Sequence, residues 1–278
     1  MTPGNNSEAA EARMGFWDHV EALRRVILAA GFIVLCFTIV YFIFMPWLFD
    51  NVILAPCRAD FPLYKFIDRL SETWNDGVAE ATPFNVSLIN IRLASQFFIH
   101  MSSSFWLGVV TAFPVIIYLL WRFVSPGLYP SERRGARKAF IFGNFMFFIG
   151  VATGYFLVFP LTLRFLAEYK VSESVANQLS LDSYMDNFVV LILVMGVVFE
   201  LPLLAWLLGR AGLLTRSFFN TYHRHAIAVL LIIAALITPT GDPFTLMVVF
   251  VPLYLLWLVS ARIVPPGDIR RDDGVTSM

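Results

Sequence analysis

Hydrophobic residues gather along the chain into long runs, and four of these runs are long enough to cross a bilayer. They cover residues 26–49, 97–124, 139–166 and 184–208. About 30 Å of hydrocarbon requires about 20 helical residues at a rise of 1.5 Å each. The pattern therefore predicts four transmembrane helices, of which the second and third are tilted or project beyond the bilayer.

Two shorter apolar runs follow towards the end of the chain. Residues 226–237 give 12 apolar positions before the turn TPTGD, and residues 244–259 give 16, with Pro252 as a kink. So tight a turn predicts an antiparallel pair of short helices. The first would span only about 18 Å, so we expect this hairpin to thin the bilayer locally or to be partly re-entrant.

The composition agrees with an all-α integral membrane protein of six transmembrane helices. Hydrophobic residues make up 58% of the 278 positions and aromatic residues 16%, well above the roughly 45–50% apolar content of a soluble domain. Two cysteines cannot form a disulfide framework and offer no zinc spacing. The formal net charge of zero carries little information, so the placement of the basic residues is more useful.

Lysine and arginine are distributed unequally between the two ends of the predicted helices. Six of the twenty fall on one side: Arg58, Lys65, Arg69, Arg92, Arg164 and Lys170. The other fourteen fall on the side that carries both termini. The positive-inside rule then predicts a multi-pass protein of the cytoplasmic (inner) membrane with both termini in the cytoplasm. We expect a disordered cytoplasmic lead at 1–15, a six-helix transmembrane domain at 16–264 and a cytoplasmic tail at 265–278.

The longest segment on the opposite side, residues 50–90, contains the sequence FPLYKFIDRL. Its apolar residues fall on a broad helical face, with Lys65, Asp68 and Arg69 opposite. Such a helix either lies on the outer membrane surface or packs as a cap over the end of the bundle. The sequence leaves both alternatives open.

Motifs for enzyme chemistry are missing. The chain has no G-x-x-x-x-G-K-[ST], no H-E-x-x-H and no G-x-S-x-G. His223 and His225 are two residues apart at a helix end, an arrangement that more often sits at the headgroup level than on a metal. Gly241-Asp242 lies in a turn, with no second aspartate in mid-membrane to share a proton. We therefore expect no enzyme activity, metal, cofactor or nucleic-acid partner.

One carboxylate interrupts the fourth long run, in the stretch VMGVVFELPLLAWLL. Glu200 stands near the middle of this stretch, two residues before Pro202. An ionised carboxylate near the bilayer centre costs about 3 kcal/mol, so such residues usually face a cavity or a polar partner. The alternative is a protonated Glu200 that is hydrogen-bonded within the bundle.

Seven motifs occur in an order that resembles the TatC family, the polytopic core subunit of the twin-arginine protein translocase. In chain order they are DHVEALRR, APC, TPFN, FVSPGLYPSERR, GYFLVFPL, GVVFELPL and ITPTGDPFTLMVVFVPLYLLW. The resemblance runs from about residue 16 to residue 263. It implies six helices in a concave, glove-like bundle with both ends cytoplasmic.

The resemblance also implies that paired arginines of a signal peptide dock on cytoplasmic carboxylates. Guanidinium and carboxylate form bidentate, charge-assisted hydrogen bonds, which select arginine over lysine. The positions that match the family's signal-peptide site are Arg24, Phe123, Pro126, Gly127, Leu128 and Glu132. Glu21, the neighbour of a position that departs from the family, is added to this candidate site. The implied partners are folded cargo with such peptides, small single-span subunits of the TatA/TatB type, other copies of the chain and membrane lipid, with export driven by the proton gradient.

Three further positions match the family, and three depart from it. Glu200 matches an intramembrane glutamate that meets the single-span partners, while Pro56 and Asp242 match positions on the opposite side from the termini. The departures are Ala22, where the family usually carries the signal-binding glutamate, and Leu246 and Trp257, where glutamine and glutamate are frequent. Glu21 is adjacent to Ala22 but lies about 100° round the helix.

A function of another class also fits Glu200. In an ion- or proton-coupled transporter of small solutes, Glu200 would be the coupling carboxylate. Transporters usually carry internal repeats and several intramembrane ionisable groups. Here only Glu200 lies deep in an apolar run, which favours the translocase subunit.

Overall fold

The computed structural model describes residues 16–74, 84–125, 130–172, 174, 177–210 and 212–264, and most of them are helical. The α-helices are α1 (Phe16–Leu48), α2 (Pro62–Trp74), α3 (Ser95–Val124), α4 (Pro130–Thr153), α5 (Phe159–Glu168), α6 (Leu181–Val198), α7 (Leu201–Arg210), α8 (Arg216–Thr221), α9 (His223–Ile237) and α10 (Pro243–Ile263). The remaining elements are two π-helical turns, η1 (Phe49–Ile53) and η4 (Gly154–Val158), one 3₁₀ turn, η2 (Ala55–Cys57), and the strands β1 (Leu88–Ile89) and β2 (Leu179–Ser180), which pair in parallel. The expected lead at 1–15 and tail at 265–278 lie outside the described residues.

Five stretches of the described residues are helical, long and apolar enough to cross a membrane. They are Val20–Leu70, Ser95–Val124, Arg137–Glu168, Leu181–Arg210 and Pro243–Ile263. Each of the four long apolar runs falls inside one of them. Helices are the expected form because a chain in lipid must satisfy its backbone hydrogen bonds within the segment. The prediction of an all-α integral membrane protein is confirmed, and the side on which the termini lie stays a prediction.

Of the two helices in the final hairpin, only the first is too short to cross a bilayer. α9 has 15 residues and is about 22 Å long, whereas α10 has 21 residues and is about 31 Å long. Pro252 is buried inside α10 without ending it. Polar residues extend α10 at both ends, because Asp242 caps its first turn and Arg262 lies in its last turn. Local thinning is therefore expected beside α9 rather than beside both helices.

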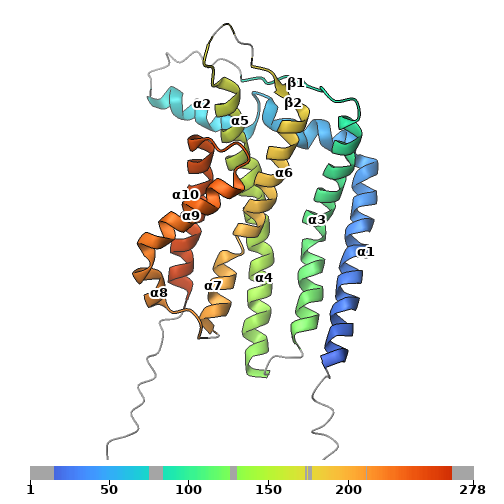
Figure 1. The fold of residues 1–278 in the computed structure, drawn as a ribbon, viewed down its shortest axis with the longest axis vertical. Helices are drawn as coiled ribbons and strands as arrows, with labels where there is room; N and C mark the ends of the chain where they lie inside the picture. The colour runs from blue at the N-terminus through green and yellow to red at the C-terminus, as the bar shows by residue number, and fades with distance from the viewer. Residues whose placement is uncertain are drawn as a thin grey trace, which may run out of the picture. The chain divides into compact units, whose positions relative to one another are not determined.

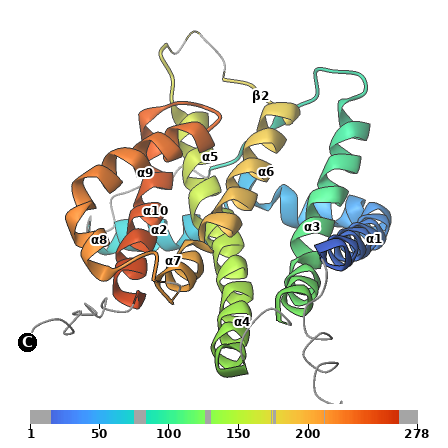
Figure 2. The same cartoon turned by 60° about the horizontal axis from the view of Figure 1, so that its bottom comes forward.

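The described residues divide into two compact units. One contains the residues up to Met45 and those from His100 to Phe140, and the other contains Pro46–Ile99 and the residues from Ile141 onward. The first unit consists mainly of α1 and α3, which lie side by side in both views (Figures 1 and 2). The second unit contains the part of α4 from Ile141 onward, the helices that follow it, α2 and the strands.

Small and hydroxyl-bearing residues join α1 to α3. A Cβ atom added at Gly108 would lie 2.7 Å from Thr38 Oγ1 and 3.0 Å from the Thr38 backbone nitrogen. The Tyr41 and Thr111 hydroxyls share a hydrogen bond of 2.7 Å between the same two helices. Glycine at the contact lets the backbones approach, which is the usual way that helices pack in lipid.

Glycines also bring α4 and η4 against α6 in the second unit. Gly150 and Gly154 form a G-x-x-x-G pair, and a Cβ atom at either would lie 2.9 Å from a Cα atom of α6. Gly196 on α6 leaves room for the Phe147 ring in return. Farther along the same contact, Phe159 packs edge-on against Tyr184, with ring centroids 5.1 Å apart. This contact forms the core of the unit.

The amphipathic helix predicted at residues 61–70 exists as α2, and only one of its faces is covered. Phe61 and Tyr64 are 3% and 1% exposed, and the Tyr64 hydroxyl donates to the carbonyl oxygen of Pro160 at 3.2 Å. Phe66 and Leu70 remain exposed. The helix therefore packs over η4 and α5 through one face, while the Phe66 and Leu70 side chains on the other face stay exposed.

Candidate functional site

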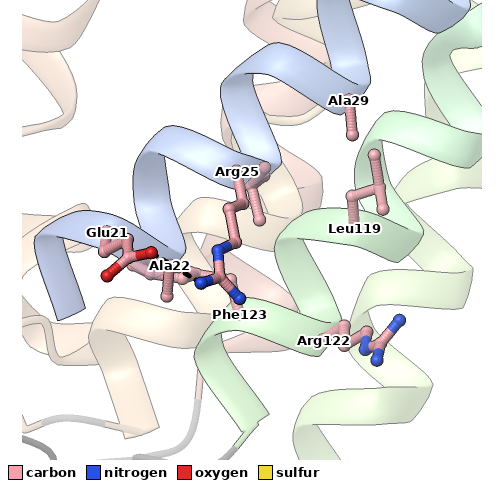
Figure 3. A pocket seen from close by; sticks show the side chains of 8 residues that line it. Glu21, Ala22, Arg25, Ala29, Leu119, Arg122 and Phe123 are labelled. Carbon is pink, nitrogen blue, oxygen red and sulfur yellow. Dashed lines mark hydrogen bonds and ion pairs between the residues drawn. The ribbon is translucent and has the colours of Figure 1, made fainter. Parts of the chain in front are cut away.

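A hollow of about 510 Å³ lies between α1 and α3, where α1 begins and α3 ends (Figure 3). Its lining residues are Glu21, Ala22, Arg25, Val26, Ala29, Leu119, Arg122 and Phe123. All of them belong to the first unit. The hollow combines charged side chains with an apolar wall.

Helical spacing explains why these residues share one surface. Ala22, Arg25 and Ala29 recur at intervals of three and four on α1, so they lie on one face of that helix. Leu119 and Phe123 are four apart on α3 and face them. Two of the α1 positions are alanine, whose side chain ends at Cβ, and this leaves the space between the helices open.

The carboxylate of the hollow already holds a guanidinium. Arg25 Nη2 lies 2.5 Å from Glu21 Oε1, one helical turn away on α1. Figure 3 shows the Arg25 side chain running beside Ala22 to reach Glu21. The two side chains are 77% and 59% exposed, so the pair contributes only about 0.3–0.5 kcal/mol. A bond this weak is easily exchanged for another.

Positive charge exceeds negative charge among the lining residues. Arg25 and Arg122 contribute two guanidinium groups and Glu21 one carboxylate. In Figure 3 the Arg122 guanidinium points away from Glu21 and Arg25. Strong binding of a cationic ligand at this hollow therefore requires a further carboxylate.

The structure brings together part of the predicted signal-peptide site. Glu21 and Phe123 both line the hollow, whereas Arg24 is exposed and is not among the lining residues. Glu132 lies on α4, with its side chain outside what the structure describes. Residues 126–128, which are Pro126, Gly127 and Leu128, lie outside the described residues. Their roles stay predictions.

The sequence interpretation did not single out Arg25, Arg122 or the apolar wall. A signal for Arg25 was present, because an arginine four residues after a glutamate on a helix forms an ion pair. The wall was also visible in part, since Ala22, Val26 and Ala29 have helical spacing. The opposing surface on α3, almost a hundred residues away in the chain, had no such signal.

Ala22 also lines the hollow. A longer acidic side chain at this position would therefore project into the same space that Arg25 crosses. Glu21 reaches the hollow from the adjacent position, although it lies about 100° round the helix. The two positions thus give access to one site from different directions.

Glu200 occupies a second candidate site, at the break between α6 and α7. α6 ends at Val198 and α7 begins at Leu201, and Pro202, which has no N–H to donate to a helical carbonyl, is compatible with the first turn of α7. The Glu200 N–H donates to the Val197 carbonyl oxygen at 3.0 Å, and α7 then resumes as the Leu204 N–H donates to Glu200 at 3.0 Å. The glutamate therefore stands at a turn between two halves of an interrupted span.

The Glu200 carboxyl group lies against the backbone of α4. A Cβ atom added at Gly143 would lie 2.7 Å from Glu200 Oε2, so glycine makes the room for the carboxyl group. Glu200 Oε1 is buried and has no hydrogen-bond partner among the described residues. A buried oxygen without a partner costs about 1–3 kcal/mol. A polar group from outside these residues would remove that cost.

Pro56 belongs to a segment whose carbonyl groups are bound by tyrosines. The Tyr64 hydroxyl donates to the Pro56 carbonyl oxygen at 2.9 Å, and the Tyr184 hydroxyl donates to Ile53 at 2.5 Å. The segment is a π turn followed by a 3₁₀ turn, which leaves carbonyl groups without their regular helical partners. Pro56 is buried in the second of these turns, Ala55–Cys57, where its ring restricts the backbone of the turn.

Asp242 is the N-cap of α10. Its Oδ1 accepts from the Thr245 N–H at 2.7 Å, and its Oδ2 accepts from the Thr240 hydroxyl at 2.6 Å. Burial raises the pKa of the Asp242 carboxyl, but these hydrogen bonds outweigh burial and hold the pKa below its ordinary value. Gly241 has a φ of +62°, which glycine adopts without strain in the preceding turn. Asp242 thus acts locally on the start of α10.

The two departures on α10 have different surroundings. Trp257 packs on Phe219 of α8, with ring centroids 4.6 Å apart, and borders the small cluster of Ala205, Phe219 and Val264. Leu246 is half-buried in the first turn, where its N–H donates to the Asp242 carbonyl oxygen. The Trp257 side chain is therefore a packing residue between α10 and α8.

Comparisons with known proteins agree on one family. The family model described as Sec-independent protein translocase protein (TatC) matches residues 18–252. A protein of that name from Blattabacterium sp. subsp. Periplaneta americana is 31% identical over 252 residues, which are 90% of this chain and 94% of that protein. The protein of the same name from Deinococcus radiodurans is 33% identical over 261 residues, 92% of this chain and 89% of its own length.

Two solved structures have the same fold. The crystal structure of the twin-arginine translocase receptor TatC is 26% identical, with a TM-score of 0.67, and covers 88% of this chain and 97% of the solved chain. The crystal structure of that receptor in DDM gives a TM-score of 0.70 at 26% identity, over 89% and 99% of the two chains.

Proposed function

Because the chain belongs to the TatC family of Sec-independent protein translocase proteins, we propose that it is the receptor subunit that binds twin-arginine signal peptides. The family is one of protein translocase components and is not a known enzyme family. In the proposed arrangement both termini are cytoplasmic, and the hollow between α1 and α3 opens on the cytoplasmic side of the inner membrane. The excess of basic residues on that side supports this orientation.

The observation that carries the proposal is the guanidinium already bound in the hollow. Arg25 meets the Glu21 carboxylate at 2.5 Å beside an apolar wall. A signal peptide offers the same chemistry, since its arginines precede an apolar stretch. One peptide arginine would take the place of Arg25 on Glu21, and the apolar stretch would follow the wall of Val26, Ala29 and Leu119.

A second carboxylate completes the proposed site. The lining residues carry a surplus of positive charge, so Glu21 alone would leave two incoming arginines poorly compensated. Glu132 matches the family's carboxylate after the second long helix, and it lies on α4 shortly after α3 ends. We assign the second peptide arginine to Glu132.

The proposal gives Glu200 a partner of its own. A buried carboxyl oxygen without a hydrogen-bond partner, at the break of an apolar span, fits a polar side chain from a small single-span subunit. Such subunits, other copies of the chain and the proton gradient complete the proposed translocase. The alternative of a small-solute transporter has no support from the family match.

Export of a twin-arginine reporter tests the function. Cells that lack their own TatC receive this chain, and export is measured for a reporter with paired arginines and for its paired-lysine control. We expect export of the arginine reporter alone. Export of neither reporter, or of both equally, would contradict the proposal.

Crosslinking tests the site separately. A photoreactive residue at Val26, which lines the hollow, should capture a twin-arginine peptide, whereas one at Ile27 should not. Ile27 is the matched control because it is next on the same helix, 61% exposed and not among the lining residues. Equal capture at the two positions would place the peptide elsewhere.

A further inference from the structure

The two faces of α2 differ in what covers them. Phe61, just before its first residue, and Tyr64 are buried, and the Tyr64 hydroxyl binds the carbonyl oxygens of Pro56 and Pro160. These contacts fix the rotation of the helix about its own axis. The opposite face therefore always points away from the protein core.

Two apolar and two basic side chains share the exposed face. Phe66 is 60% exposed and Leu70 46% exposed, and Lys65 and Arg69 are exposed beside them. Each pair is four residues apart and so forms a row along the helix, with about 100° between the rows. The exposed face is therefore apolar along one edge and basic along the other.

The position of α2 puts this face at a membrane boundary. The helix follows the turns η1 and η2, which interrupt the chain directly after the long helix α1. Figure 1 shows α2 running crosswise to α5 and to the part of α4 from Ile141 onward, which belong to the same unit. Because α4 and α5 lie within the span Arg137–Glu168, and α2 contacts the last third of that span at Pro160, a crosswise helix there runs along the membrane plane rather than through it.

We propose that the α2 face formed by Lys65, Phe66, Arg69 and Leu70 binds anionic phospholipid in the adjacent leaflet. Phe66 and Leu70 enter the boundary between headgroups and acyl chains, and Lys65 and Arg69 meet the phosphates. This is the usual division of an interfacial helix, in which long basic side chains reach the headgroups over an apolar edge. Charge complementarity selects lipid as the occupant, because the row beside the apolar edge is basic.

This proposal resolves the alternatives that the sequence left open for residues 61–70. The helix acts as a cap through Phe61 and Tyr64 and as a membrane-surface helix through Phe66 and Leu70. It does not depend on the signal-peptide site, which lies in the other unit. The lipid contact would hold the tyrosine-bound turn at Pro56 at a set depth in the membrane.

Depth-dependent quenching on the full chain tests the proposal. The two native cysteines are replaced, Cys36→Ser and Cys57→Ala, and a fluorophore is attached at Phe66→Cys or, as the matched control, at Lys65→Cys. The chain is reconstituted in vesicles of phosphatidylcholine with or without phosphatidylglycerol. Each label is quenched by nitroxide attached to the lipid acyl chains and, separately, by iodide in the water. We expect the ratio of nitroxide quenching to iodide quenching to be at least about threefold higher at 66 than at 65.

Headgroup selectivity forms the second arm. Nitroxide on the phosphatidylglycerol headgroup should quench the label at 66 more than nitroxide on phosphatidylcholine does, with a preference of about fivefold for each basic side chain. Lys65→Gln with Arg69→Gln should bring the preference close to one, while thermal unfolding stays unchanged. Equal iodide access at 65 and 66 would mean that the face lies in water. Protection of both sites from iodide and nitroxide would mean a protein contact, and either result overturns the proposal.

Discussion

Arg25→Gln is expected to strengthen binding of a twin-arginine peptide, because it removes an internal competitor. In the structure Arg25 occupies the Glu21 carboxylate that the peptide arginine must reach. Every peptide that binds there first displaces Arg25. A glutamine at 25 keeps the helix and most of the side-chain volume, but it cannot hold the carboxylate as a guanidinium does.

The structure sets the size of the gain. The pair joins residues four apart on one helix and both side chains are exposed, so it contributes about 0.3–0.5 kcal/mol. Since about 1.4 kcal/mol corresponds to a tenfold change in Kd, the gain from losing the competitor is about twofold. It should be equal for arginine and lysine peptides, because a competitor on the carboxylate acts on both alike. Glu21→Ala should instead weaken binding about tenfold or more, as a charge-assisted hydrogen bond contributes about 1.5–3 kcal/mol.

Peptide affinity for a small set of variants measures both effects. The affinity gain from Arg25→Gln should shrink in a Glu21→Gln background, where no carboxylate remains to be released, and the cycle of single and double variants isolates this coupling. Ala22→Glu should restore binding to Glu21→Ala, because position 22 lines the same hollow. Glu132→Ala gives the comparison for a full loss at the other proposed carboxylate.

Two results would refute this reasoning. An Arg25→Gln gain of the same size in both backgrounds would reflect only the lost positive charge. A silent Glu21→Ala would show that the site works without a carboxylate on α1. High salt should reduce all these differences, because exposed charges are screened.

Three further predictions concern stability. Gly150→Ala should destabilise the fold by about 1–3 kcal/mol in thermal unfolding, because the new Cβ would clash with backbone atoms of α6, which cannot move as a side chain can. Gly31→Ala is the control and should not destabilise the fold, because its Cβ would meet nothing within 4 Å. Asp242→Ala should cost about 0.5–2 kcal/mol through loss of the α10 cap. Because the folded pKa of Asp242 is depressed, this difference should be full at neutral pH and disappear as the pH falls below about 3.9, and a pH-independent difference would contradict the assignment. Tyr184→Phe should cost about 1–3 kcal/mol by leaving the Ile53 carbonyl unbound, and an unchanged unfolding midpoint would show that water replaces the hydroxyl.

Features that depend on neighbours along the chain could be predicted from the sequence. Each of the four long apolar runs is part of a span, because the ability to cross the bilayer depends on the number of consecutive apolar residues, which can be read from the local sequence. The turn at Gly241-Asp242 was likewise predicted from the local sequence TPTGD. Glu200 stood out since a carboxylate in an apolar run is costly wherever the run packs. Family motifs added the function, which no local pattern contained.

Features that depend on residues distant in the chain came only from the tertiary structure. The hollow exists because Ala22 and Ala29 of α1 face Leu119 of α3, and no pattern within either helix specifies the other. Trp257 of α10 packs on Phe219 of α8, a contact that no pattern within either helix specifies. The amphipathic pattern of α2 showed two faces, but only the hydrogen bonds of Tyr64 decided which face is buried. Periodicity determines which side chains share a surface of one helix. The close approach of two helices depends on the shapes of both surfaces together, so it is determined only when the helices pack.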